Sequence, residues 1–171
     1  MNYASIKYMD VANGPGVRTS LFVSGCNHHC PGCFNQEAQS FDYGKPFTEE
    51  VENEIISTLR NGLTILGGEP MEIANAIALA PFLEKVRKAK PDISIWLYSG
   101  FTLEQLMSRE NEDLEITKRV LDNVDIIIDG PFVLNLKSIR LQFRGSSNQR
   151  VIDLKKTFQT GKIVIWENLR R

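Results

Sequence analysis

The chain has 171 residues, a length that favours one domain with a well-buried core. It carries 42% hydrophobic and 24% charged residues and a formal net charge of −1, so its bulk charge favours neither nucleic acid nor an anionic membrane as a partner. No apolar run approaches the roughly 18–20 residues of a membrane span, and the amino-terminal residues lack the features of a signal peptide. We expect a single cytoplasmic domain over residues 1–171 that binds neither nucleic acid nor a membrane.

Strands and helices alternate in the predicted secondary structure. β-rich apolar runs predict strands at residues 3–9, 19–24, 63–66, 93–98 and 124–128 and an edge strand at residues 163–166. Helices are predicted from Thr48 to a C-cap at Asn61-Gly62, after Pro70 to about Lys90, from a capping box at Thr102 and Gln105, and over residues 115–121. Pro81 should kink the second of these helices or mark a restart.

This alternation predicts an α/β fold, because strands separated by helices imply right-handed crossovers and a mostly parallel sheet. A complete eight-unit barrel takes about 250 residues, so we expect a partial, open (β/α) barrel of about five or six βα units. Ligands of such folds bind beyond the carboxyl ends of the strands. Four turn-forming segments directly follow strands and should share that rim: Gly25-Cys26, residues 67–70, Ser99-Gly100 and Asp129-Gly130.

All three cysteines of the chain lie within eight positions, as Cys26, Cys30 and Cys33. This C-x3-C-x2-C run can aim three thiolates at one point, which suggests a metal or an iron–sulfur cluster. A [4Fe–4S] cluster ordinarily takes four protein ligands, so three would leave one iron open to another group. Two alternatives stay open: a zinc site completed by His28 or His29, and a reactive dithiol formed by Cys30 and Cys33.

The cysteine spacing resembles the signature of the radical S-adenosylmethionine (SAM) enzymes, whose open iron is chelated by the amino and carboxylate groups of SAM. The usual signature has an aromatic residue just before the third cysteine, whereas here Gly32 takes that place and Phe34 follows. Cys30-Pro-Gly-Cys-Phe-Asn35 is instead similar to the glycyl-radical activases, in particular those of anaerobic ribonucleoside-triphosphate reductase. Asn13-Gly-Pro-Gly-Val-Arg18, Arg144-Gly-Ser-Ser-Asn-Gln149 and the short length support the same resemblance, which spans nearly the whole chain.

The resemblance implies a set of binding residues. A [4Fe–4S] cluster would be held by Cys26, Cys30 and Cys33. Gly67-Gly-Glu-Pro70 resembles the element that receives the amino group of SAM, so SAM would be contacted by Gly32, Cys33 and Phe34 at its adenosyl end and by Gly67, Gly68 and Glu69 at its methionine end. His28 and His29 are expected to be solvated or to support the site without ligating it, and Trp96 to lie in the core or on a surface that packs against a helix.

The activity implied by the resemblance is that of a radical SAM oxidoreductase, a glycyl-radical activating enzyme. The reduced cluster would cleave SAM to a 5′-deoxyadenosyl radical that takes a hydrogen atom from a glycine in the large subunit of anaerobic ribonucleoside-triphosphate reductase. Reduced flavodoxin or a similar donor would supply the electron, and no catalytic acid, base or nucleophile of the protein is required. Two alternatives are a small radical SAM enzyme acting on a metabolite and a dithiol or metal-binding redox module. The sequence does not decide between a homodimer and a heterotetramer.

Overall fold

A seven-stranded sheet organises the computed structural model, which describes residues 1–168. In chain order the strands are β1 (Asn2–Asp10), β2 (Arg18–Val23), β3 (Lys45–Pro46), β4 (Gly62–Gly67), β5 (Ser94–Tyr98), β6 (Ile126–Asp129) and β7 (Arg150–Asp153). The helices are α1 (Glu49–Thr58), α2 (Ile73–Ala89), α3 (Leu103–Met107), α4 (Asn111–Leu121) and α5 (Leu154–Thr160), with 3₁₀ turns η1 (Glu37–Gln39) and η2 (Leu134–Leu136).

The sheet is mixed and does not close on itself, with the strand order β3-β1-β2-β4-β5-β6-β7. Its four central strands, β2, β4, β5 and β6, are parallel neighbours, whereas β1, β3 and β7 pair antiparallel at the two edges. The predicted α/β class and mostly parallel sheet are therefore confirmed. A barrel of five or six βα units is not confirmed, because β1 and β2 are joined without a helix and the chain reverses between them.

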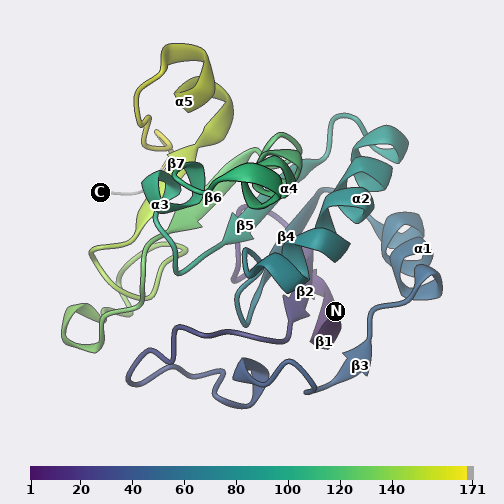
Figure 1. Cartoon of the computed structure of the whole chain (residues 1–171), viewed down its shortest axis with the longest axis horizontal. Coiled ribbons are helices and arrows are strands. Elements are labelled where there is room, and N and C mark those ends of the chain that lie inside the picture. Colours follow the sequence, from purple (N-terminus) through teal and green to yellow (C-terminus); the bar gives the residue numbers. More distant parts are fainter. Residues whose placement is uncertain (169–171) are drawn as a thin grey trace.

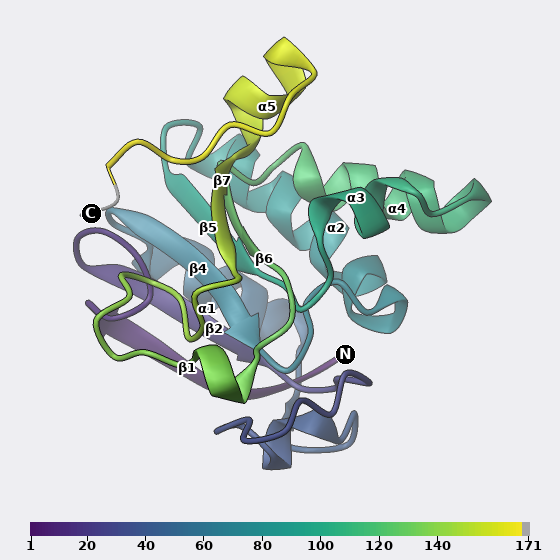
Figure 2. The ribbon, with the colours of Figure 1, turned by 90° about the vertical axis from the view of Figure 1, so that its left-hand side faces the viewer.

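Helices α1, α2 and α4 pack on one face of the sheet (Figure 1). Alternate residues of the parallel strands point toward them and are buried, as at Leu21, Ile65 and Leu97. The segment that joins β6 to β7, residues 131–149, passes over the opposite face and is here called the covering segment (Figure 2). A smaller cluster lies on that face around Trp96, which is buried as predicted and packs edge-to-face on Phe143.

Most predicted elements are present, but several of their ends differ. Helix α1 begins after Thr48 as expected, yet it ends at Thr58, because Leu59 leaves the helix in an extended conformation and turns into the core. Gly62, predicted as its C-cap, is instead the first residue of β4. Pro81 lies inside a helix that runs without interruption over Ile73–Ala89, so the predicted restart is wrong.

The carboxyl-terminal part of the described chain holds the larger departures. Helix α4 starts at Asn111, four residues earlier than predicted, whereas the capping box of Thr102 and Gln105 is confirmed. Residues 163–166 form only an isolated bridge, between Ile165 and Ile152, because the chain first turns through α5. Sequence reasoning missed α5, which Asp153 caps at its amino terminus.

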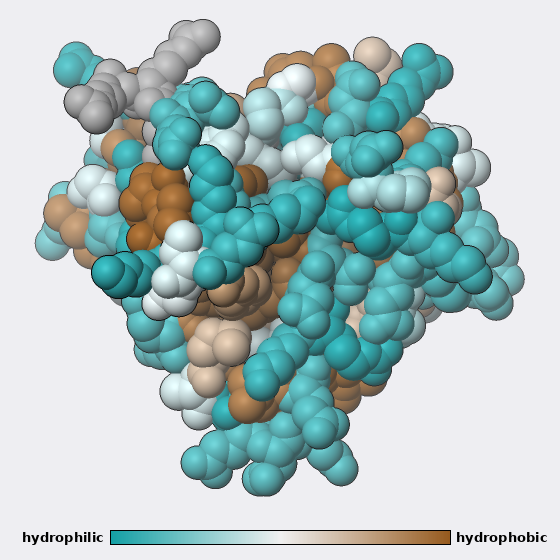
Figure 3. Space-filling view, turned by 90° about the horizontal axis from the view of Figure 1, so that it is seen from above, coloured by the Kyte–Doolittle hydropathy of each residue, from teal (hydrophilic) through white to brown (hydrophobic). Residues whose placement is uncertain are grey.

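The surface shows no continuous apolar area in the view of Figure 3, where polar residues cover most of the face and apolar ones form separate patches between them. Of the helices in residues 1–168, none combines the length and the apolar character that a bilayer crossing needs.

Candidate functional site

A cavity of about 350 Å³ opens at the carboxyl ends of the parallel strands. This volume lies within the range of about 300–1,000 Å³ that is usual for small-molecule sites. All four segments predicted to share the rim contribute to its wall, through Cys26, residues 67–69, Ser99-Gly100 and Gly130. The rim expected from strand order is therefore confirmed.

The three cysteines lie on one irregular loop, residues 24–35, here called the cysteine loop. All three are free, half-buried and exposed to the same cavity. The backbone N–H of Cys33 donates to the carbonyl of Cys30 at 3.1 Å, so the intervening Pro31-Gly32 forms a tight turn. The start of the loop is fixed from the other side, because the N–H of Cys26 donates to the carbonyl of Gln39 at 3.0 Å. Three thiols from one short loop thus face one space.

The Cys26 thiol has its pKa raised to about 11, chiefly by burial, with the nearby carboxylate of Glu69 acting in the same direction. Metals and clusters bind the thiolate form, so binding at Cys26 would release a proton.

Both imidazoles of the cysteine loop are engaged away from the thiols. His28 Nε2 donates to Glu69 Oε2 at 3.1 Å, and His29 Nδ1 lies 2.9 Å from Gln39 Oε1. Within residues 1–168, no group of three or more His, Cys, Asp or Glu side chains is arranged to hold one metal ion. A tetrahedral zinc site needs four ligands at one point, whereas a [4Fe–4S] cluster takes one thiolate at each of several separate irons. Three free thiols that line one cavity supply the three ligands that a [4Fe–4S] cluster with one open iron requires.

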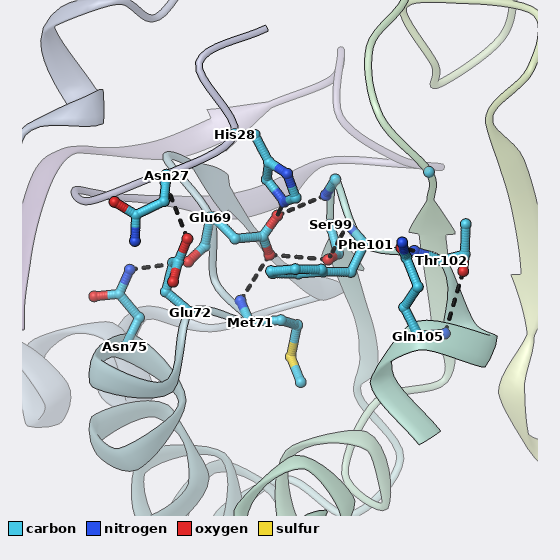
Figure 4. Close-up of polar contacts among 12 residues, drawn as sticks. Asn27, His28, Glu69, Met71, Glu72, Asn75, Ser99, Phe101, Thr102 and Gln105 are labelled. Atoms are coloured by element: carbon cyan, nitrogen blue, oxygen red, sulfur yellow. Dashed lines mark hydrogen bonds and ion pairs between the residues drawn. The ribbon is translucent and has the colours of Figure 1, made fainter. Parts of the chain in front are cut away.

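Glu69 is the centre of the polar contacts beside the cavity (Figure 4). Its side chain is 1% exposed. Oε1 accepts from the backbone N–H of Met71 at 2.8 Å and from Ser99 Oγ at 2.9 Å, and Oε2 accepts from the N–H of Gly100 at 2.6 Å in addition to His28. The pKa of His28 is raised by the hydrogen bond to Glu69, against the opposing effect of burial. A carboxylate with four donors holds three segments of the rim together while it keeps a negative charge at the cavity wall.

The cysteine loop and the loop of residues 67–70 are in direct backbone contact. The N–H of Glu69 donates to the carbonyl of Gly25 at 2.8 Å. A Cβ at Gly68 would lie 2.6 Å from that same carbonyl oxygen, so only glycine allows this approach. Asn75, at the start of α2, completes the junction by donating to the carbonyls of Ser24, Gly25 and Glu69. The glycines of this motif are thus required by packing, whatever ligand they also serve.

Most of the predicted site residues meet at the cavity. Those that line it are Cys26, Cys30, Cys33, Phe34, Gly67, Gly68 and Glu69. Gly32 does not line it and instead lies against Leu134 of the covering segment. Phe34, the displaced aromatic of the cysteine motif, is 87% exposed at the cavity, an unusual position for a large apolar side chain.

The covering segment supplies a wall that sequence reasoning did not assign. Its residues at the cavity include Phe132, Leu141, Phe143 and Arg144, and from the sheet Tyr98 points into the same space. The signal for Tyr98 was present, because alternation along β5 places it on the face opposite the helices. No comparable pattern marks the covering segment, which has almost no regular structure.

The motif Arg144-Gly-Ser-Ser-Asn-Gln149 shapes this wall. Gln149 Oε1 accepts from the N–H groups of Gly145 and Ser146, Gln149 Nε2 donates to the carbonyl of Gly130, and Arg144 Nη1 donates to the carbonyl of Gln149. The N–H of Val133 adds a bond to Ser146 Oγ at 3.2 Å. These bonds give the motif a structural role in holding the covering segment over the sheet.

The Asn13-Gly-Pro-Gly-Val-Arg18 motif is anchored by a buried arginine. Arg18 is 2% exposed and donates to Thr64 Oγ1 and to the carbonyls of Leu63 and Ser94, all within 2.9 Å. Burial lowers the pKa of its guanidinium to about 10. Asn13 lines the cavity, so the motif contributes to the cavity wall.

Comparison with known proteins shows which family the chain resembles over most of its length. A family model described as a 4Fe-4S single cluster domain matches residues 12–152. An anaerobic ribonucleoside-triphosphate reductase-activating protein of Vibrio cholerae is 39% identical over 155 residues, which cover 87% of this chain and 96% of that protein. The protein of the same name from Escherichia coli K12 is 37% identical over 161 residues, 91% of this chain and 100% of the relative. That of Enterobacteria phage T4 is 37% identical over 155 residues, 88% and 93% of the two chains.

These matches cover most of this chain and most of each relative, at identities well above the level at which only a fold is shared. The residues matched by the family model contain the cysteine loop, the loop of residues 67–70 and the whole covering segment. The chain therefore belongs to the family of anaerobic ribonucleoside-triphosphate reductase-activating proteins, and it carries the 4Fe-4S single cluster domain.

Proposed function

We propose that the protein is a single-domain radical SAM activase that generates a glycyl radical on the large subunit of anaerobic ribonucleoside-triphosphate reductase. The observation that carries this proposal is that three free thiols and the loop of residues 67–69 line the same cavity. A dithiol would need only two of these thiols, whereas a [4Fe–4S] cluster with one open iron uses all three.

The chemistry that the cluster and SAM supply when bound is one-electron cleavage. One electron from an external donor such as reduced flavodoxin breaks the C5′–S bond of SAM, giving methionine and a 5′-deoxyadenosyl radical, which becomes 5′-deoxyadenosine by taking a hydrogen atom from a glycine Cα. The protein's own contribution is to bind, orient and shield these groups.

The residues have distinct tasks in this proposal. Cys26, Cys30 and Cys33 hold the cluster, and the absence of a fourth ligand from the loop leaves one iron for the methionine end of SAM. Backbone groups of Gly67 and Gly68 accept the ammonium of SAM, and the buried charge of Glu69 favours a cation there without contacting it, since its oxygens already have four donors. Gly32, Cys33 and Phe34 lie toward the adenosyl end. Phe34, 87% exposed, is available to both SAM and the incoming glycine segment.

The deciding experiment mixes anaerobically reconstituted protein with SAM, a reductant and the large reductase subunit. We expect SAM-dependent 5′-deoxyadenosine and a glycyl-radical doublet in the electron paramagnetic resonance spectrum, and neither with a Cys33→Ala variant. SAM cleavage without a doublet would exclude the reductase as the substrate and favour a small-molecule substrate. A colourless protein with stoichiometric zinc after reconstitution would overturn the radical chemistry itself.

A further inference from the structure

His28 is the side chain that fastens the middle of the cysteine loop to the rest of the rim. The base of the loop, up to Gly25, is held by backbone bonds and by Asn75. Beyond that point, three contacts within residues 1–168 join the cysteine loop to the loop that follows β4. The N–H of Asn27 donates to Glu72 Oε1 at 3.0 Å, the His28 imidazole reaches Glu69 at 3.1 Å, and Asn35 Nδ2, at the far end of the cysteine loop, donates to the carbonyl of Gly67 at 3.4 Å. Of the three partners, Glu69 is buried whereas Glu72 and Gly67 are half-buried, so His28 makes the contact to the most buried group on the cavity wall (Figure 4).

The imidazole sits in a slot that the surrounding residues are built to form. Its ring packs edge-on against Phe101, with centroids 4.4 Å apart. A Cβ at Gly100 would lie 2.6 Å from the His28 ring, so the absence of a side chain at Gly100 makes the space for it. The N–H of Gly100 and Ser99 Oγ bind the same carboxylate that His28 binds. One side chain of the cysteine loop is thus locked into the ends of two neighbouring strands.

The neighbouring His29 differs from His28 in exposure and in the partner that it contacts. His29 is exposed, and its Nδ1 meets Gln39 Oε1 in an exposed contact that leaves the strand ends untouched. The two residues are adjacent in sequence and differ in what they hold, which provides a matched control within one loop.

We propose that His28 is a positioning residue, which sets the orientation of the Cys26–Cys30 half of the cluster site relative to the SAM-binding loop of residues 67–69. The proposal rests on the proposed function, because it assumes that a cluster and SAM meet in this cavity. Its physical basis is the sensitivity of reactions between held groups to small displacements, where a shift of about 1 Å can cost roughly 100-fold in rate. The three thiols alone retain the cluster, and His28 decides how it faces SAM.

The test applies the same substitution to both histidines. Asparagine is too short to bridge from position 28 to Glu69, and at position 29 it tolerates the left-handed backbone, where φ is 47°. In cluster-free protein, hydrogen–deuterium exchange of the cysteine loop should accelerate in His28→Asn and stay near wild type in His29→Asn. After reconstitution, His28→Asn should bind iron at the wild-type ratio, form the glycyl radical about 10- to 100-fold more slowly and consume more SAM per radical formed.

Rescue separates positioning from general damage. His28→Gln places an amide donor at a similar reach, and it should recover slow exchange and part of the lost coupling between SAM cleavage and radical formation. Wild-type exchange and coupling in His28→Asn would overturn the proposal, and so would loss of iron from that variant, because His28 would then retain the cluster without orienting it. If wild-type protein itself forms no glycyl radical, the proposed function fails, whereas the exchange experiment on cluster-free protein still tests the contact.

Discussion

Asn75 offers the most direct test of how the two loops of the site are joined. Its side chain is 1% exposed, and Nδ2 donates to the carbonyls of Glu69 at 2.9 Å, Ser24 at 3.0 Å and Gly25 at 3.3 Å. An amide nitrogen carries two protons, so these contacts amount to about two full hydrogen bonds. The carbonyls of Gly25 and Glu69 also accept a backbone N–H, whereas the carbonyl of Ser24 would be left without its donor.

We expect Asn75→Ala to lower the free energy of unfolding by about 3 kcal/mol. Two buried hydrogen bonds contribute roughly 1 kcal/mol each, and the orphaned carbonyl of Ser24 adds about 1 kcal/mol or more. Asn75→Asp should be worse, since it keeps the shape of the side chain and turns a donor into an anion among carbonyl oxygens. The comparison of the two variants separates hydrogen bonding from cavity formation.

The assay is urea unfolding of cluster-free protein under reducing, anaerobic conditions, with the transition followed by circular dichroism. Asn123→Ala serves as the control, because the Asn123 amide makes only an exposed bond to the carbonyl of Arg119, and its loss should stay within about 0.5 kcal/mol. An Asn75→Ala variant equal to this control, or an Asn75→Asp variant more stable than Asn75→Ala, would refute the reasoning.

Three further substitutions test other parts of the molecule. Gly68→Ala should separate the two loops, because its Cβ would lie 2.6 Å from the Gly25 oxygen. We expect the variant to hold less iron per chain after reconstitution, and an iron content equal to that of the wild type would contradict the predicted overlap. Arg18→Met should cost about 1–3 kcal/mol in urea unfolding, since carbonyls of two strands lose a charged donor; unchanged stability would mean that relief of guanidinium desolvation offsets the loss. The Arg150 hydrogen bonds lower the pKa of Glu104 to about 2, so its carboxylate stabilises the fold above about pH 4.5 and this contribution is lost as the pH falls toward 2. Glu104→Gln should therefore flatten the acid limb of the stability curve and cost less than about 1 kcal/mol at pH 7, because the pair is exposed; an unchanged acid limb would count against the Glu104 contribution.

Several local rules were sufficient to predict much of the fold from the sequence. Thr102 and Gln105 form the predicted capping box, and the apolar runs at residues 19–24 and 93–98 are buried strands. Turn residues directly after parallel strands were enough to predict a shared rim, because parallel strands place their carboxyl ends at one edge. The set of three thiols could be predicted equally well, because its cysteines lie within eight positions of the chain.

Strand direction at the sheet edges could not be read in the same way. Whether β1 and β7 run parallel or antiparallel depends on how their connections cross the sheet, and the sequence between β6 and β7 contains no helix long enough to signal a crossover. The covering segment is held by bonds such as that of Gln149 to Gly130, which join residues far apart in sequence. No local pattern marks such contacts.

By itself, then, the sequence determined most of the central strands and helices and which thiols gather, because periodicity, capping and close spacing act over a few residues. Only the tertiary structure decided that Glu69 is a buried hub for His28, Ser99 and Gly100, and that Gly68 is glycine because another loop passes against it. Those roles arise from segments that meet solely through folding of the sheet. The sequence predicts Glu69 as a contact of SAM, whereas in the folded chain its carboxylate accepts four hydrogen bonds from the protein.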